Sequence, residues 1–219
     1  MIYNTIEELQ KVTGPEVWRP FVINTGTEYK THDWYSISNW GRVMSHLKRG
    51  RKRAGQERVD HSRKTIMTTT DNSCVLGHKR MSFVFPSEFF DYEYAKASKT
   101  DGNTVIVKFY LHQLVMWAYN PIENDPPALL TDVWDDIPEI AKVFIDSILV
   151  TNHINHNPAH NFLANLERVR QKENTRSAKD HYGGNPANKR QFKTEHGEDL
   201  KIVDLIEEER KPSLQLFYA

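Results

Sequence analysis

The stretch from Thr151 to Asn174, TNHINHNPAHNFLANLERVRQKEN, holds the residues best suited to chemistry. It contains six asparagines and three histidines, and almost no apolar run. A neutral imidazole can take a proton from water near pH 7, because the unperturbed pKa of histidine is about 6.5. The side-chain carbonyl of asparagine is an oxygen ligand of the kind that hard divalent cations prefer. The stretch therefore indicates either an ordinary polar loop or a site for metal-assisted hydrolysis.

Two short strands and a helix are expected to position these side chains. Ser147 to Thr151 favours a strand, and Asn165 to Val169 favours a short antiparallel partner across the asparagine-rich loop. Gln171 to Lys179 favours a helix. The predicted order is therefore strand, loop, strand, helix.

The residues NHINHNPAHNFLANLERVRQKENTR (152–176) resemble the HNH motif of phage and intron-encoded homing endonucleases. That family has a histidine, an Asn-Leu pair twelve residues later and a Glu-Asn pair nine residues further on, met here by His153, Asn165-Leu166 and Glu173-Asn174. The resemblance implies an α+β fold with a ββα-metal, or His-Me finger, nuclease core. It also implies that His153 is the general base and that Asn165 braces the loop. Asn152 and Asn174 would then hold a metal ion.

Two further segments resemble parts of the same family. LHQLVMWAYNP (111–121) is similar to the helix that precedes the motif, and it has a helical apolar period. EVWRPF and WYSISNWGRVMSH, within 16–46, resemble a small nuclease-associated modular domain. Together the three resemblances cover about half of the chain. His112 could reach the site or cap its own helix, and the second reading is favoured.

The resemblance implies one divalent cation, Mg²⁺ or Mn²⁺, which would act as Lewis acid and template. Zinc is the disfavoured ion. His153, His156 and His160 form a His-x₂-His-x₃-His set, but Cys74 is the only cysteine and the family spacing assigns other ligands. Many relatives have aspartate in place of Asn152. With asparagine there, weak metal binding until DNA phosphate completes the shell, or reduced activity, is expected.

The net charge of zero conceals two basic blocks that favour contacts with DNA phosphates. Nine basic residues lie between Arg42 and Lys64, and eight lie between Arg168 and Lys193. The predicted DNA contacts are Arg42, Lys48, Arg49, Arg51, Lys52, Arg53, Arg170, Lys172 and Arg176. Arg170 stands where relatives have a serine or threonine helix cap, which favours a phosphate contact over capping. Acidic residues gather in 123–146 and after Glu195, where they could meet a protein partner.

Three regions are predicted along the chain. Residues 1–64 form a small β-rich module that contacts DNA, with a helix capped by Thr5, a hairpin over 34–46 and a basic loop. Residues 65–180 form the nuclease core, with strands near 79–85 and 104–109 and an acidic helical insertion near 123–148. The apolar stripe of that insertion is expected to face the core; it comprises Ile137, Ile140, Ala141, Phe144 and Ile148. Residues 181–219 form a C-terminal extension with an acidic helix over 199–210.

The function expected from the resemblance is metal-dependent cleavage of double-stranded DNA, in a homing-type role encoded by a phage. The protein would act as a monomer or weak dimer, and a monomer would nick. Hydrophobic residues make up 38% of the chain and charged residues 26%, which favours a packed core over disorder. No secretory signal or membrane span is predicted, so a cytoplasmic location, in the host cell for a phage protein, is expected. The alternatives are an inactive DNA-binding protein with the same fold and a phage packaging or accessory protein.

Overall fold

The structure is a computed structural model that describes residues 6–48, 59–62, 64–67, 78–90 and 104–182. Several predictions lie outside these residues: the Thr5 cap, the four arginine and lysine residues at 49 and 51–53, and the C-terminal extension after residue 182 with its acidic helix. The described residues mix helices and strands, so the α+β class is confirmed. No described helix is long and apolar enough to cross a membrane.

The first part of the chain is an antiparallel sheet preceded by helix α1 (Ile6–Thr13). The strands are β1 (Trp18–Asn24), β2 (Tyr29–Ser38), β3 (Val43–Ser45) and β4 (Thr65–Met67), in the spatial order β1-β2-β3-β4. The predicted hairpin is confirmed, because β2 and β3 pair across a turn in which Gly41 has a φ of 78°. Strand β4 was not predicted, since three residues are too few for an apolar pattern.

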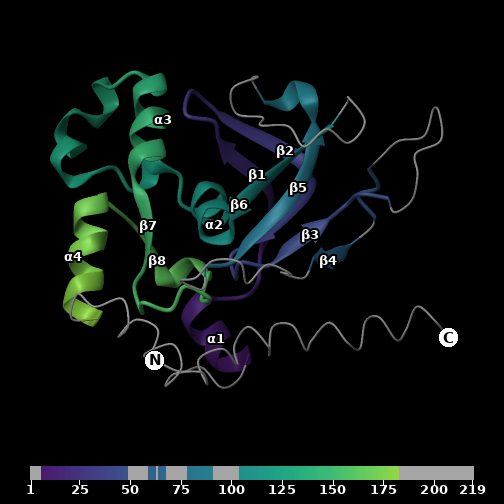
Figure 1. Ribbon diagram of the computed structural model, residues 1–219, viewed down its shortest axis with the longest axis horizontal. Helices are drawn as coiled ribbons and strands as arrows, with labels where there is room; N and C mark the ends of the chain where they lie inside the picture. The colour runs from purple at the N-terminus through teal and green to yellow at the C-terminus, as the bar shows by residue number, and fades with distance from the viewer. Residues whose placement is uncertain (1–5, 49–58, 63, 68–77, 91–103, 183–219) are drawn as a thin grey trace.

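A second antiparallel pair supports the helix that reaches the site. Strands β5 (Arg80–Pro86) and β6 (Thr104–Tyr110) pair along their whole length, and a short 3₁₀ helix, Ser87–Phe89, follows β5. Helix α2 (Leu111–Tyr119) begins directly after β6, as predicted, and Figure 1 shows it near the centre of the molecule. Its leucine and valine side chains, Leu114 and Val115, are fully buried.

One hydrophobic core joins the regions on both sides of residue 64. Phe21 and Ile37 from the first sheet lie in the same buried cluster as Phe83, Leu114 and Leu166. The phenylalanine rings of 21 and 83 meet edge to face, with 4.9 Å between their centroids. The first sheet is therefore packed against the later elements, and the site is built on a shared support.

The acidic insertion folds as predicted into helices, but its apolar stripe faces outward. It contains 3₁₀ segments at Ile122–Asn124 and Ala128–Asp136, then helix α3 (Glu139–Ile148). Ile140, Phe144 and Ile148 are 61%, 55% and 59% exposed, so the predicted core-facing stripe is wrong. The opposite face is turned inward because Asp146, which is 5% exposed, binds polar partners in the interior.

The last described elements are two short strands and a helix. Strand β7 (Val150–His153) pairs antiparallel with β8 (Leu166–Val169), and α4 (Gln171–Tyr182) follows. The predicted first strand was placed too early, since residues 147 and 148 continue α3. The predicted second strand began one residue early, because Asn165 ends a 3₁₀ turn, Leu163–Asn165. Helix α4 packs against β7, and both lie on the same side of the molecule in Figure 1.

Candidate active site

His153 is the last residue of β7, and its imidazole is enclosed, with 4% of the residue exposed. Its Nε2 lies 3.2 Å from Oδ1 of Asn161. The Asn161 amide nitrogen donates to the carbonyl of Ala159, at 3.0 Å, which fixes Oδ1 as the atom that faces the ring. The His153 Nε2–H must therefore donate, and Nδ1 keeps its lone pair.

Burial lowers the pKa of His153 to about 3, although the Asn161 hydrogen bond opposes the shift. Nearby histidines, His78 first among them, lower it further. The ring is therefore neutral at pH 7, which is the state that can accept a proton.

Asn165 closes the loop that follows His153. Its Nδ2 donates to the backbone carbonyl of His160 at 2.8 Å, and its Oδ1 accepts from the backbone N–H of Asn155 at 3.0 Å. Its own carbonyl accepts from the N–H of Ile154 at 2.9 Å. The side chain is 4% exposed, so one buried amide holds both ends of the loop. This is the geometry that a bracing residue would have.

The other loop histidines contact amides of the loop. His160, 1% exposed, has its ring nitrogens 2.8 Å and 3.2 Å from the side-chain nitrogens of Asn155 and Asn157. His156 has a φ of 60°, a left-handed backbone position in the turn. The set His153, His156 and His160, considered from spacing, is thus not the histidine group that gathers among the described residues.

Asn152 lies beside His153 on β7 and pairs across the strands with Glu167. Its Nδ2 donates to Oε1 of Glu167 at 2.7 Å, which leaves the Asn152 carbonyl oxygen for another partner. The sequence reasoning missed Glu167. It directly follows the Asn-Leu pair, and only the antiparallel register of β7 and β8 places it opposite Asn152.

Asn174 lies in the first turn of α4 and is half-buried. Glu173, one residue earlier, caps the same helix: its Oε2 accepts from the backbone N–H of Arg170 at 3.0 Å. The Arg170 guanidinium pairs with the same carboxylate. The Arg170 side chain is therefore not the helix cap, which the Glu173 carboxylate supplies instead. The phosphate contact of Arg170 stays a prediction.

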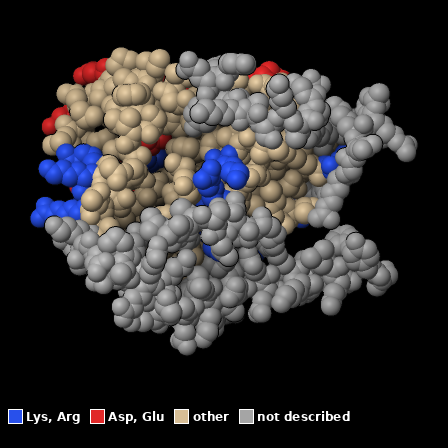
Figure 2. Space-filling model, in the orientation of Figure 1, with Lys and Arg blue, Asp and Glu red and all other residues tan. Residues whose placement is uncertain are grey.

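Basic side chains gather on the outer face of α4. Arg170, Lys172 and Arg176 are exposed, and Figure 2 shows Lys and Arg side chains over this edge of the molecule. Lys48 is also exposed. Arg42 is different: its guanidinium pairs with Glu16 and lies over the rings of Trp18 and Trp40, 5.8 Å and 5.6 Å from their centroids. Its side chain is 12% exposed, so it is committed inside the protein.

His112 faces the site and does not cap its helix. The residue before α2, Tyr110, forms the N-cap without a side-chain hydrogen bond. The His112 ring lies 5.1 Å from the His153 ring, centroid to centroid, and 5.3 Å from that of His78. The favoured reading of His112 as a cap is therefore wrong. Sequence reasoning did not single out His78, because it stands alone in the sequence, two residues before β5.

The turn between β2 and β3 touches the site loop directly. The Asn39 carbonyl accepts from the N–H of Leu163 at 2.8 Å. A Cβ on Gly41 would lie 2.8 Å from both Cβ and the carbonyl oxygen of Asn161. Only glycine allows this approach. The turn therefore supports the residue that holds the His153 ring.

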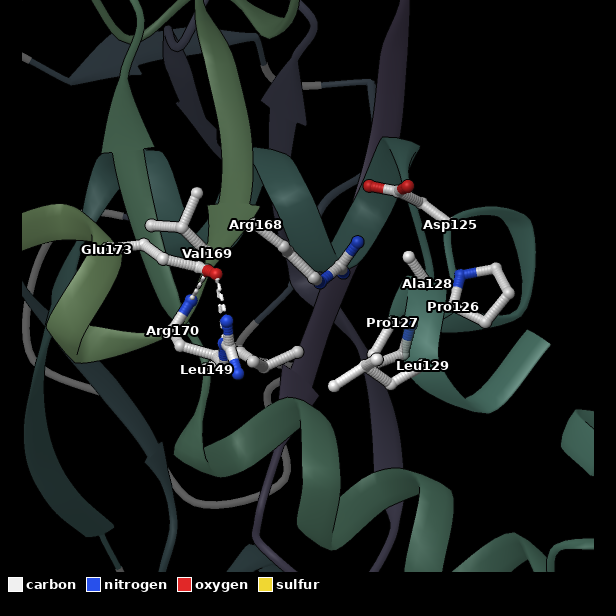
Figure 3. A pocket seen from close by; sticks show the side chains of 10 residues that line it. All are labelled: Asp125, Pro126, Pro127, Ala128, Leu129, Leu149, Arg168, Val169, Arg170 and Glu173. Atoms are coloured by element: carbon white, nitrogen blue, oxygen red, sulfur yellow. Dashed lines mark hydrogen bonds and ion pairs between the residues drawn. The ribbon is translucent and has the colours of Figure 1, made fainter. Parts of the chain in front are cut away.

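A pocket of 320 Å³ lies where the insertion meets β8 and α4 (Figure 3). Asp125, Pro127 and Leu129 line it from the insertion, and Arg168 and Arg170 line it from the end of β8. Neither His153 nor the asparagines at 152, 165 and 174 are among its lining residues. The pocket is therefore separate from the histidine and asparagine site.

No protein-family model and no curated protein matches the chain. A solved structure of the HNH homing endonuclease I-HmuI, concerned with DNA binding and cleavage by that enzyme, matches with a TM-score of 0.38 and 19% sequence identity. The match covers 81% of this chain, and the chain spans 66% of the length of that structure.

Proposed function

We propose that the protein is a metal-dependent DNA endonuclease of the HNH class, with β7, β8 and α4 as its ββα-metal core. The observation that carries the proposal is the set of contacts around His153. Its ring is neutral, its tautomer is set by Asn161, and its loop is closed by Asn165. Asn152 precedes it on the same strand, and the helix that bears Asn174 packs on that strand.

The chain's own residues supply the base and the positioning. Nδ1 of His153 would accept the proton of the attacking water, a role typically worth about 10²–10⁴-fold in rate. Asn161 would hold the ring while it is protonated, because its carbonyl oxygen faces Nε2 at 3.2 Å. Asn165 would keep the strand end and the loop in register.

The residues present fit a hard divalent cation. The Glu167 carboxylate accepts a hydrogen bond from the amide nitrogen of Asn152. The amide oxygen is therefore the group left to bind an ion. Glu167 also places a negative charge beside Asn152, which carries none. Asn152 and Asn174 would hold the Mg²⁺ or Mn²⁺, which would stabilise the charge on the phosphate and the leaving oxygen.

Double-stranded DNA would lie along the face that carries α4. Arg170, Lys172 and Arg176 are exposed there, with Lys48 elsewhere on the surface, and phosphate contacts of this kind give salt-sensitive affinity. We leave Arg42 out of the contacts because its side chain is 12% exposed and paired with Glu16, whereas the Arg170 side chain, which pairs with Glu173, is 64% exposed. The division at residue 64, action as a monomer or weak dimer, a phage homing role and a cytoplasmic location remain parts of the proposal.

The test is conversion of supercoiled plasmid by the full chain with Mg²⁺ or Mn²⁺, with and without EDTA. We expect nicking that EDTA abolishes. His153→Ala should lower the nicking rate at least about 100-fold with nearly unchanged DNA affinity in a gel shift. His61→Ala is the matched control, because His61 is exposed and pairs with Asp33 away from the site. Equal nicking by His153→Ala would remove this residue from the mechanism.

An inactive DNA-binding protein is the second candidate. The enclosure of His153, 4% exposed, favours it, because water and phosphate must reach the ring in an enzyme. In that case the wild type would shift the plasmid on a gel and leave it intact with every metal tried.

A further inference from the structure

Three imidazoles from distant parts of the chain meet at the site. His78 precedes β5, His112 lies in the first turn of α2, and His153 ends β7. One ring nitrogen from each lies within 4.8 Å of the others. The ring centroids form a nearly equilateral triangle, with sides of 5.3, 5.4 and 5.1 Å. Such convergence of like groups calls for a physical cause.

The cluster is enclosed and short of hydrogen-bond partners. His112 and His153 are 7% and 4% exposed. Nδ1 of His112 is buried and has no hydrogen-bond partner among the described residues. A buried polar atom left unpaired destabilises the folded state, so an occupant that bonds to this nitrogen would stabilise the fold.

The two enclosed rings, His112 and His153, are in the neutral state that binds a cation through nitrogen. Burial lowers the pKa of His112 well below its ordinary value, and the neighbouring His153 and His78 lower it further. No carboxylate contributes to the shift of either His112 or His153. Neutral imidazole is a preferred ligand of zinc, whereas Mg²⁺ prefers oxygen.

We propose that His78, His112 and His153 bind one Zn²⁺ ion, with a fourth position left for water. Three-histidine zinc sites with an open position are a known arrangement. A Zn–N distance of about 2.0–2.1 Å and tetrahedral angles require ring nitrogens roughly 3.3 Å apart. The nitrogens lie within 4.8 Å, so small ring rotations would close the site. This set is unrelated to the spacing of His153, His156 and His160.

Zinc binding is tested on the purified full chain after treatment with a chelator. We expect one Zn²⁺ per chain by isothermal titration, and a visible absorption band of tetrahedral Co²⁺ when Co²⁺ replaces it. His78→Gln and His112→Gln should each weaken zinc binding at least about tenfold, since two nitrogen ligands remain of three. His156→Asn is the control, because asparagine tolerates the φ of 60° at that position.

Thermal unfolding is compared between the wild type and His78→Gln. This test therefore does not depend on whether His112→Gln folds. Zinc at about 100 times its dissociation constant should stabilise the wild type by roughly 2.7 kcal/mol through mass action, and should leave the half-buried variant His78→Gln with a much smaller shift. Zinc uptake that is unchanged in His78→Gln, or that is lost in His156→Asn, would overturn the assignment.

One consequence rests on the proposed function. If His153 is the base, zinc occupies its lone pair and inhibits Mg²⁺-dependent nicking. The readout is the ratio of nicking rates with and without zinc, which should be lower for the wild type than for His78→Gln. Zinc binding without any nicking would sink the nuclease and keep the zinc site. Nicking without zinc binding would do the reverse.

Discussion

Glu167 is the residue that most changes the charge expected around the proposed metal ligands. From the sequence, two asparagines would bring no charge to a cation. In the structure the Glu167 carboxylate lies 2.7 Å from the Asn152 amide nitrogen, across the β7–β8 pair. It can orient the amide and add a negative charge near the ion at the same time. The two effects are separable, because glutamine keeps the acceptor and loses the charge.

We predict that Glu167→Gln raises the Mg²⁺ concentration for half-maximal nicking roughly two- to fivefold, since a single screened charge near the ion is lost. Glu167→Ala should raise it further, because the orientation of Asn152 is lost as well. Metal titrations of the nicking rate measure both. Glu139→Gln, on the exposed start of α3, is the charge-matched control. An unchanged metal dependence in Glu167→Ala would show that this side chain plays no part.

Helix α3 is tied to the site by one buried carboxylate. Asp146 accepts hydrogen bonds from Nε of Arg168 at 2.5 Å, from the hydroxyl of Tyr29 at 2.7 Å and from Nδ2 of Asn24 at 3.0 Å. Arg168 is on β8, one residue after Glu167. The acidic insertion is therefore fastened to both the first sheet and the site strand, rather than appended to the surface.

Asp146→Ala should destabilise the protein by about 3–5 kcal/mol, because it leaves the buried Arg168 guanidinium without its counter-ion. The side chains are 2% and 5% exposed, and both terminal nitrogens of Arg168 are buried without a hydrogen-bond partner among the described residues. Urea unfolding measures the change. Asp135→Ala, exposed on the same insertion, should change stability by less than about 0.5 kcal/mol. Similar values for the two variants would contradict the ion-pair account.

The β2–β3 turn acts on the site through packing. A Cβ at Gly41 would press on Asn161, which holds the His153 ring. Gly41→Ala should therefore lower the nicking rate even at temperatures at which the variant is fully folded. Gly14→Ala is a matched control: Gly14 has a φ of 71°, close to the 78° of Gly41, but no atom lies within 4 Å of its added Cβ. Both variants place an alanine in the left-handed region and so carry a similar backbone strain, of about 1–2 kcal/mol. Equal loss of nicking in the two would mean that the contact with Asn161 has no catalytic effect.

At the scale of the whole molecule, buried neutral histidines should make stability depend on pH. Burial lowers the pKa values of His32, His112 and His153 in the folded state, the last to about 3. Below pH 6.5 the unfolded chain then binds more protons than the folded one. Stability should be fully present above pH 6.5 and fall steadily as the pH drops toward 3.

Thermal midpoints measured between pH 7.5 and pH 4 test this expectation. His32→Leu should flatten part of the decline, because His32 lies among the rings of Trp34, Phe85 and Phe89 and can be replaced by an apolar side chain. A midpoint that stays constant from pH 7.5 to pH 5 would contradict the buried neutral state.

The elements were largely predictable, and the contacts between them were not. The hairpin and α2 follow from turn residues and apolar period, and α4 was expected in the predicted order of strand, loop, strand and helix. The orientation of α3 does not follow from its apolar period, because Ile140, Phe144 and Ile148 favour burial but are exposed, while Val143 and Asp146 are turned inward. At the site, spacing pointed to His153 and Asn165. The roles of Asn161, Glu167 and His78 depend on strand register and on approach between distant segments, which a single sequence does not disclose.

The contact between Gly41 and Asn161, with the bond from Leu163 to Asn39 beside it, bears on how such a protein can change over evolutionary time. A gene rearrangement that replaced the first 64 codons with those of another protein would import a different hairpin. The recombinant protein would keep the contact only if the new hairpin also had glycine at the position of Gly41. Exchange of this segment is therefore constrained by the absence of a single methyl group at Gly41.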